Sequence, residues 1–256
     1  MTEPYLFEAK CPPEFDDCLQ SGGAAAWAYR RAPTRCTLET AYWEGPRAPD
    51  GKTHFHNEAQ MVFVLSGRRE FIVGSRLYVV HAGQALLIPA GHLHRSAPSG
   101  NWPTRCLNLY VPQSEVALLC QTMKISPDTR TEKGEISDVV QSSLMILSDT
   151  NSKFRDVSTL AAAFGYSREA FSRKFSREAG IGPAEFSLLV RLNRARALLR
   201  DGSAAALTAR ECGFADQSHM GRHFLRTFGV SPGQYARTRS VTNVPDGTVG
   251  GVRRFN

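Results

Sequence analysis

The chain has 256 residues, 42% of them hydrophobic, and carries a formal net charge of +7. This length and apolar content suit two globular domains, each with a buried core. No uncharged apolar stretch approaches the ~18 residues of a membrane span, and the scattered cysteines, without any C-x-x-C spacing, argue against disulfides and zinc ligands.

The positive charge is unevenly distributed along the chain. Residues 1–135 contain 14 Lys and Arg against 14 Asp and Glu, whereas residues 136–256 contain 17 against 10. The second part is therefore the one expected to neutralise phosphate groups. The acidic start, Met1 to Tyr5, lacks the apolar run of a signal peptide, so we expect a cytoplasmic protein with no membrane partner.

Short strands separated by turns dominate the first part of the chain. Residues 1–34 are rich in Pro, Gly and Ala, show weak periodicity and receive no function. The pattern then predicts strands at Thr37–Tyr42, Met61–Leu65, Arg69–Val73, Leu77–Val80, Ala85–Ile88 and Leu107–Val111. Many short strands at regular spacing indicate an all-β sandwich or barrel.

Two groups of residues among these strands resemble the two motifs of the cupin family. The first group is His54, His56, Gln60 and Gly67, and the second is Gly83, Pro89, Gly91 and His94. The resemblance covers roughly residues 37–110 and implies a jelly-roll barrel. It departs from the family at Gln60, where metal-binding cupins have glutamate, and at Pro98, where the second motif has asparagine.

The cupin-like motifs bring together side chains suited to binding a ligand inside the barrel. His54 and His56 alternate along the chain and so point to one face, where His94 and Gln60 join them. One alternative is a divalent metal ion held by His54, His56 and His94. The other is a small-molecule effector held by all four residues as neutral donors and acceptors. Gln60 supplies less charge than glutamate, which favours the effector and no cofactor.

A helix and a linker follow the barrel. Apolar residues recur at helical spacing between Gln113 and Lys124, and this helix packs either on its own barrel or against a second subunit. The polar segment 126–135 lacks apolar periodicity, so we expect an interdomain linker there. An amphipathic helix at Ile136–Leu147 then opens the second domain.

The second part of the chain contains an internal repeat. Residues Phe175–Phe186 match Phe224–Tyr235 in residue type at a constant offset of 49. Each copy is predicted to be a short helix, a glycine turn, and a second helix that a polar residue caps and a glycine ends. The first copy uses Val157–Phe164, Gly165, Ser167 and Gly180, and the second uses Ala204–Cys212, Gly213, Asp216 and Gly229.

Helix, tight turn and helix is the arrangement of the DNA-reading helix-turn-helix, although two such hairpins also suit a plain helical bundle. The run from Cys212 to Tyr235 is close to the signature of the AraC/XylS family of transcription regulators, and the resemblance covers about Ile136 to Arg239. It implies an all-α double helix-turn-helix domain at 136–239. We therefore expect a cupin-like domain at 1–125, a linker at 126–135, this DNA-binding domain, and a loose tail at 240–256.

The segment between the repeats is expected to set their spacing. Pro183 to Arg200 contains no helix breaker and predicts a rod of roughly 27 Å. Such a rod would hold two reading helices about one DNA turn, roughly 34 Å, apart. Its expected buried stripe is Leu188, Leu192, Ala195 and Leu199. Its arginines at 191, 194, 196 and 200 are assigned to other faces, either solvated or against phosphate.

Seven side chains on the second helices point away from the apolar positions and are candidates to read DNA. They are Arg168, Glu169, Ser172 and Arg173 in the first copy, and Gln217, Ser218 and Arg222 in the second. Arginine pairs with the guanine edge and glutamine with the adenine edge. For each side chain the alternative is a phosphate contact or simple exposure.

The sequence thus predicts a transcription regulator, not an enzyme, that binds double-stranded promoter DNA under the control of a small-molecule effector. The AraC resemblance further implies a homodimer, and RNA polymerase as a partner if the protein is an activator. The alternative is a metal-dependent cupin-type enzyme or metal sensor. Against the enzyme stand the missing glutamate and the lack of a second ionisable pair among the motif residues.

Overall fold

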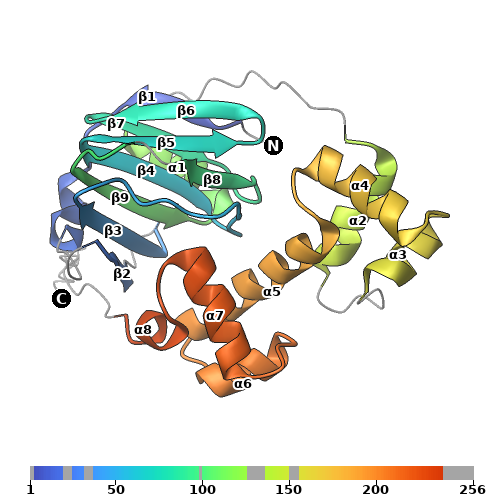
Figure 1. The fold of residues 1–256 in the computed structure, drawn as a ribbon. Helices are drawn as coiled ribbons and strands as arrows, with labels where there is room; N and C mark the ends of the chain where they lie inside the picture. The colour runs from blue at the N-terminus through green and yellow to red at the C-terminus, as the bar shows by residue number, and fades with distance from the viewer. Residues whose placement is uncertain are drawn as a thin grey trace, which may run out of the picture.

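The computed structural model describes residues 3–19, 25–31, 37–97, 100–125, 136–149 and 156–238. A β domain comes first and a helical domain second (Figure 1). The expected linker at 126–135 and the expected tail at 240–256 lie outside the described residues. Among the described helices, none is long and apolar enough to cross a bilayer.

The described strands of the first domain form two antiparallel sheets. The larger has the order β1-β7-β4-β9-β3-β2, built from Tyr5–Glu8 (β1), Trp27–Arg31 (β2), Glu39–Gly45 (β3), Ala59–Ser66 (β4), Gln84–Ile88 (β7) and Thr104–Val111 (β9). The smaller has the order β6-β5-β8, built from Arg68–Val73 (β5), Arg76–His81 (β6) and His94–Ala97 (β8). All six predicted strands are confirmed, while β1, β2 and β8 are additional. The cupin-like architecture is therefore present.

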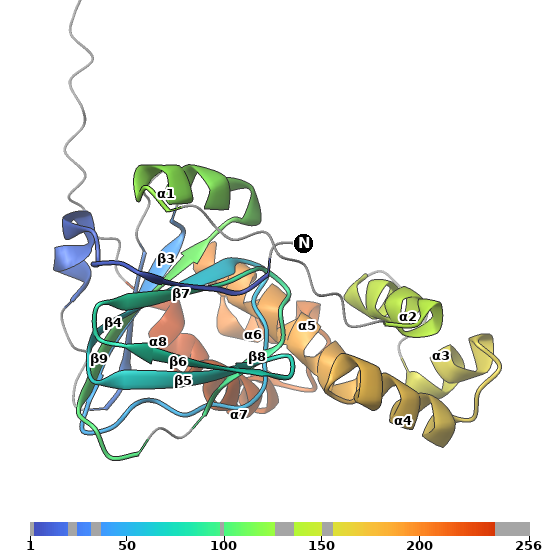
Figure 2. The same cartoon turned by 90° about the horizontal axis from the view of Figure 1, so that it is seen from above.

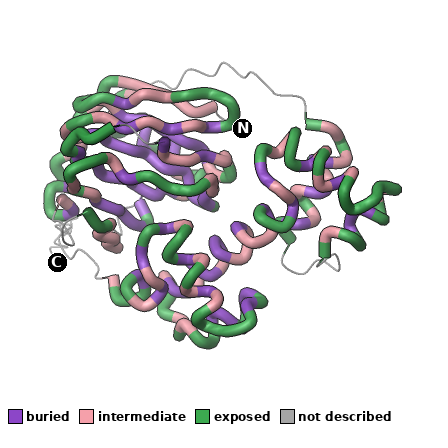
Figure 3. The backbone as a smooth tube through the Cα atoms, in the orientation of Figure 1, coloured by how far each residue is buried: buried purple, intermediate pink, exposed green. Residues whose placement is uncertain are grey.

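Strand alternation explains how the larger sheet is covered on both faces. On β4, Val62 and Val64 pack against Phe71 and other residues of the smaller sheet. Met61 points the opposite way, into a second core. Successive side chains of a strand point to opposite faces, so β4 is buried along most of its length. Figure 3 shows the central strands of this sheet as the most continuously buried part of the domain.

The second core is closed by a helix and a 3₁₀ turn. Helix α1 (Val116–Thr122), which follows the turn η2 (Gln113–Glu115), contributes its apolar face, and η1 (Pro13–Cys18) contributes Phe15. Figure 2 shows α1 on the side of β4 and β9 that faces away from β5 and β6. The helix thus packs on its own barrel, the first of the two alternatives, and leaves Leu118 42% exposed.

In the second domain, the described residues form seven helices. They are α2 (Asp138–Ser148), α3 (Val157–Ala163), α4 (Arg168–Ala179), α5 (Pro183–Arg200), α6 (Ala205–Glu211), α7 (Gln217–Phe228) and α8 (Pro232–Ala236). Helix α5 is the central rod, with α2, α3 and α4 at one end and α6, α7 and α8 at the other (Figures 1 and 2). Its bounds are those predicted, because Pro183 occupies the first turn and the chain has no breaker before Asp201.

One expectation for α5 was wrong in a way that matters for function. Leu189 is buried and Leu188 only partly so, and Arg196, assigned to an outer face, is 1% exposed. The cause is the barrel, which lies against this side of α5: the side chain of Asn193 donates to the carbonyl oxygen of Phe55 in the β domain at 2.9 Å. The two domains are therefore docked on each other.

Candidate functional site

The two helical repeats have the caps and turns that the sequence predicts. The Ser167 hydroxyl and the Asp216 carboxylate accept hydrogen bonds from the backbone N–H three residues on, at 3.2 and 2.6 Å. Gly180 and Gly229 end α4 and α7 at φ of 79° and 71°, the left-handed region that glycine reaches without strain. Each repeat is thus a helix, a turn and a helix, with α4 and α7 as the second helices.

The predicted DNA-reading residues lie on the accessible faces of α4 and α7. Their apolar faces bury Phe171 and Phe175 in one repeat and Met220 and Phe224 in the other, all 0% exposed. Of the seven candidates, Ser172 is half-buried and the other six are exposed: Arg168, Glu169, Arg173, Gln217, Ser218 and Arg222. The helices α4 and α7 stand toward opposite ends of α5 (Figure 1). Their contact with DNA remains a prediction.

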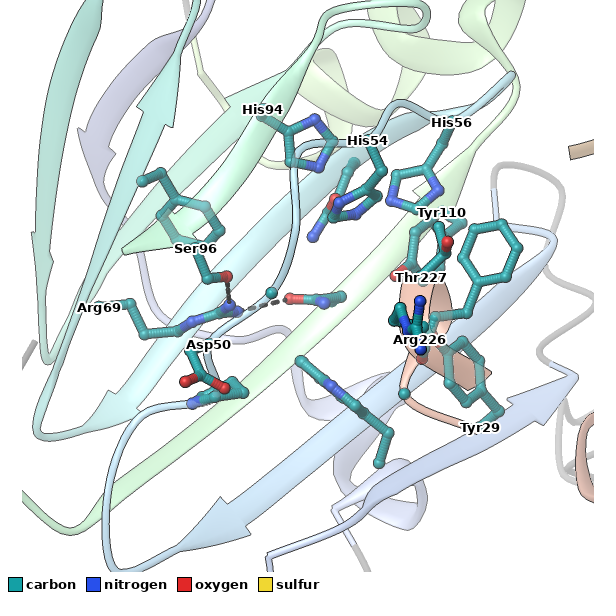
Figure 4. A pocket seen from close by; sticks show the side chains of 18 of the residues that line it. Tyr29, Asp50, His54, His56, Arg69, His94, Ser96, Tyr110, Arg226 and Thr227 are labelled. Atoms are coloured by element: carbon teal, nitrogen blue, oxygen red, sulfur yellow. Dashed lines mark hydrogen bonds between the residues drawn. The ribbon is translucent and has the colours of Figure 1, made fainter. Parts of the chain in front are cut away.

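A cavity of about 200 Å³ lies between the two domains (Figure 4). Its barrel side contains all four predicted effector residues: His54, His56, Gln60 and His94. Its other side is formed by residues 225–229, the end of α7 and the glycine that follows it. A ligand in this interdomain cavity would therefore contact both the barrel and the second helical repeat.

The three imidazoles converge, but they do not present equivalent nitrogens. One ligand nitrogen from each lies within 4.8 Å of the others. The Nδ1 atoms of His54 and His94 face the carbonyl oxygens of Lys52 and His92 at 2.7 and 2.8 Å, so each must carry a proton there. Their Nε2 atoms are then lone-pair acceptors.

His56 has the opposite tautomer. Its Nδ1 lies 2.8 Å from Nη1 of Arg196, and because a guanidinium only donates, Nδ1 must accept. The proton of the neutral ring is then on Nε2, which is buried and has no partner among the described residues. Removal from water lowers the pKa of His54 to about 4 and lowers the pKa values of His56 and His94 well below the ordinary range. All three rings are therefore neutral at pH 7.

This donor set does not fit a divalent ion in the docked arrangement. Metal-ligating histidines usually donate their second nitrogen to a carbonyl or carboxylate, which holds for His54 and His94. His56 cannot offer Nε2 to an ion while Arg196 donates to its Nδ1. Gln60 adds no negative charge, and the positive charges of Arg69 and Arg196 act on the same rings. The three rings thus present one N–H donor, on His56, and two lone-pair acceptors, on His54 and His94, a set that suits a polar organic ligand better than a divalent cation.

A buried ion-pair network joins the two domains beside the cavity. Arg196 of α5 pairs with Glu39 of β3, and lies 3.6 Å from a carboxylate oxygen of Glu58. Glu39 is 0% exposed and also accepts from the Tyr235 hydroxyl and from Arg31, at 2.8 Å for the arginine. The guanidinium of Arg196 thus has two carboxylates beside it, which Arg31 and Arg200 share.

Two parts of the cavity, Arg69 and strand β2, were not predicted from the sequence. Arg69 is 2% exposed on β5 and reaches into the cavity beside Ser96 (Figure 4). A signal existed, because Arg69 alternates with Phe71 and Val73 on the inward face of a predicted strand. Strand β2 gave no such signal in the sequence. It carries Tyr29, whose hydroxyl donates to the carbonyl oxygen of Phe228 at 2.9 Å.

Comparisons with known proteins agree with this two-domain arrangement. A helix-turn-helix domain model matches residues 160–238, and a cupin domain model matches residues 45–110. A putative AraC-like transcription regulator of Streptomyces antibioticus is 26% identical over 231 residues, covering 81% of this chain and 75% of that protein. The chain is an AraC-family transcription regulator with an N-terminal cupin domain.

Further similarities are more local or concern the fold alone. The regulator is 32% identical over 83 residues to MtrA of Neisseria gonorrhoeae, which is 32% of this chain but only 28% of the length of MtrA. ToxT of Vibrio cholerae, solved with a bound unsaturated fatty acid, superposes with a TM-score of 0.50 at 11% identity, covering 79% of this chain and 95% of ToxT. That likeness supports the order and shape of the two domains.

Proposed function

We propose that this regulator binds promoter DNA through α4 and α7, and that a small molecule in the interdomain cavity controls this binding. The observation that carries the proposal is the position of the cavity. The barrel supplies one wall and the end of α7 supplies another. An effector bound there acts on DNA affinity to the extent that it favours the docked arrangement over another.

The charge and exposure of the helical domain support DNA as the partner. The excess positive charge of the chain lies in residues 136–256, and exposed Arg168, Arg173 and Arg222 stand on the two reading helices. Arginine, glutamine and serine are side chains that contact base edges in the major groove. Helix α5 has 18 residues, roughly 27 Å of helix, and is the rod that we propose holds the two helices about one DNA turn apart.

Relatives support control by an effector and further partners. ToxT, which shares the two-domain fold, has been crystallised with an unsaturated fatty acid, so the fold accommodates an organic ligand. The family resemblance also supports a homodimer, and contact with RNA polymerase where the regulator activates transcription. The metal-dependent enzyme and the metal sensor gain no support from the cavity, because its histidines and arginines do not fit a cation.

Selection of bound duplexes from a random pool tests the DNA-binding proposal. The full chain should enrich one motif with two conserved blocks about one helical turn apart. The selected duplex should then bind at least tenfold more tightly than random duplex at the same salt concentration, since phosphate contacts alone do not discriminate sequence. Equal affinity for selected and random DNA would refute sequence-specific regulation.

A further inference from the structure

Two arginines are almost completely buried in the described part of the chain, and their surroundings differ. Arg196, 1% exposed, pairs with the carboxylates of Glu39 and Glu58. Arg69, 2% exposed, has no carboxylate within 4 Å among the described residues, although exposed Asp50 lines the same cavity. A buried charge is costly unless an opposite charge and hydrogen bonds compensate it, so Arg69 lacks what Arg196 has.

Every group that touches Arg69 is neutral. Its Nη2 donates to the Ser96 hydroxyl at 2.5 Å and its Nη1 to the Asn108 amide oxygen at 3.4 Å. Burial raises the pKa of Cys106, which lies 3.6 Å from Nη1, so that this side chain stays a thiol. The Nε–H has no hydrogen-bond partner within the described ranges. Hydrogen-bonding capacity and one full positive charge therefore remain available at the cavity.

We propose that Arg69 binds the carboxylate of a small organic acid, and that this acid is the effector of the interdomain cavity. The inference rests on the effector-binding function proposed above and names the chemical class of the ligand. A guanidinium presents its N–H groups in a fork that matches a carboxylate, and the pair is strongest where water is excluded.

The rest of the cavity favours the same class of ligand. His56 lines the cavity and has a buried Nε2–H with no hydrogen-bond partner among the described residues, which suits a hydrogen-bond acceptor. The rings of Trp27 and Phe228 line the cavity and suit an apolar body, while the ring of Phe71 packs against the Arg69 guanidinium at 4.3 Å. A volume of about 200 Å³ compares with the ~150 Å³ of a cavity that holds benzene. The acid is therefore compact, with one ring or a short chain.

The same position explains how an acid would act on DNA binding. Arg69 belongs to β5 of the barrel, whereas the opposite wall, residues 225–229, belongs to the second helical repeat. A carboxylate on Arg69 places the apolar body of the acid against the end of α7. The bound acid thereby stabilises one arrangement of the two domains relative to others.

Thermal unfolding of the full chain with paired ligands tests the proposal. Butyrate and benzoate are compared with butyramide and benzamide, which have nearly the same shape but no charge. The acids should raise Tm in a concentration-dependent manner, because a ligand that binds only the folded state stabilises it by mass action. The amides should leave Tm unchanged. Equal shifts for acids and amides would overturn the role of Arg69.

Two variants complete the test. Arg69→Gln should abolish the response to the acids, whereas the matched control Arg68→Gln should retain it, because Arg68 lies on the opposite face of β5, where it pairs with Glu70 at 3.1 Å. An unchanged acid response in Arg69→Gln overturns the inference. If Arg69→Gln does not fold, the comparison of acids with amides on the unaltered chain still decides. A Tm increase with Zn²⁺ and none with any acid also contradicts the proposal.

A DNA-binding measurement distinguishes failure of the acidic ligand class from failure of effector control. Affinity for the selected duplex is measured with each ligand in parallel. If neutral ligands shift Tm and DNA affinity, effector control stands and the acidic class is wrong. If the acids shift Tm but leave DNA affinity unchanged, Arg69 is a carboxylate site and effector control fails.

Discussion

Arginines occur in two environments in this protein: exposed on α4 and α7, and buried beside the cavity. Substitutions in the two environments should therefore affect stability and DNA affinity differently. An exposed guanidinium is solvated in the free protein, so its removal has little effect on stability and appears mainly in DNA affinity. A buried guanidinium such as Arg196 is part of a network whose members depend on one another for compensation. The reading residues should therefore be separable from the residues that hold the domains together.

Arg222 allows this separation to be measured. Arg222→Ala should weaken binding to the selected duplex by about 1–3 kcal/mol and relax the preference at one base pair, because a bidentate contact to guanine is lost. Fluorescence anisotropy on selected and random duplex checks the result. Arg177→Ala, which removes the same charge near the end of α4, is the control and should weaken both duplexes slightly and equally. A uniform loss for Arg222→Ala would assign it to the DNA backbone instead.

Helix α2 is tied to the first reading helix by one carboxylate. Glu178 of α4 accepts from the Ser137 backbone N–H at 3.0 Å and from its hydroxyl at 2.6 Å, at the start of α2. Lys174 donates to the other carboxylate oxygen at 2.7 Å. Hydrogen bonding from Lys174, and then from Ser137, lowers the pKa of Glu178 to about 2. The carboxylate therefore stabilises the packing of α2 only while it is ionised.

The stability of the helical domain should accordingly contain a contribution from Glu178 that depends on pH. Its folded-state pKa of about 2 is below the ordinary 4.5, so this contribution is present above pH 4.5 and is lost as the pH falls toward 2. Glu178→Gln should lower stability at pH 7, and the difference from the unaltered chain should shrink between pH 4.5 and 2. Urea unfolding across this range measures both effects. A difference independent of pH would contradict the assignment.

The elements that could be predicted from sequence are those specified by local chemistry. Ser167, Gly180 and Pro183 fix the end of one helix and the start of the next through their own backbone preferences, so the bounds of α4 and α5 followed closely. Strand β2 could not be predicted, because Trp27–Arg31 lacks alternation and is ordered by pairing with β3. Pairing between distant segments leaves little trace in a short stretch of sequence.

Some residues of the candidate site could also be predicted from the sequence, and others could not. His54, His56, Gln60 and His94 were predicted because the cupin spacing places them on one inward face. The burial of Arg196 was not, because it depends on contact between two domains that are distant in sequence. A local clue was present: Arg196 follows Leu192 by four residues and so shares its face of α5. A charged residue within a buried stripe indicates a partner across an interface.

At the scale of the whole molecule, Glu39 is the residue on which docking depends. It accepts from Arg196, Arg31 and Tyr235 at the junction of β3, α5 and α8. Glu39→Gln leaves Arg196 with Glu58 as its remaining carboxylate and should weaken docking by up to about 3–5 kcal/mol, the usual cost of breaking a buried ion pair. The radius of gyration from small-angle scattering should rise. Glu44→Gln, an exposed change on the same strand, should leave it unchanged.

A docked, compact Glu39→Gln variant with unaltered stability would show that the network does not hold the domains together. If the variant unfolds before scattering can be measured, hydrogen exchange at residues 192–199 of α5 in mild conditions reports the same opening. Relative to the unaltered chain, exchange should increase more in this segment than in α3, because of the two only the α5 segment is covered by the barrel.

The central claim is that α4 and α7 read one DNA site as a rigid pair, and hydroxyl-radical footprinting on the selected duplex tests it most directly. The unaltered chain should protect two stretches about 10 base pairs apart on one face of the helix. Arg173→Ala should weaken protection of one stretch and Arg222→Ala the other. A single protected stretch that both variants weaken equally would contradict the account.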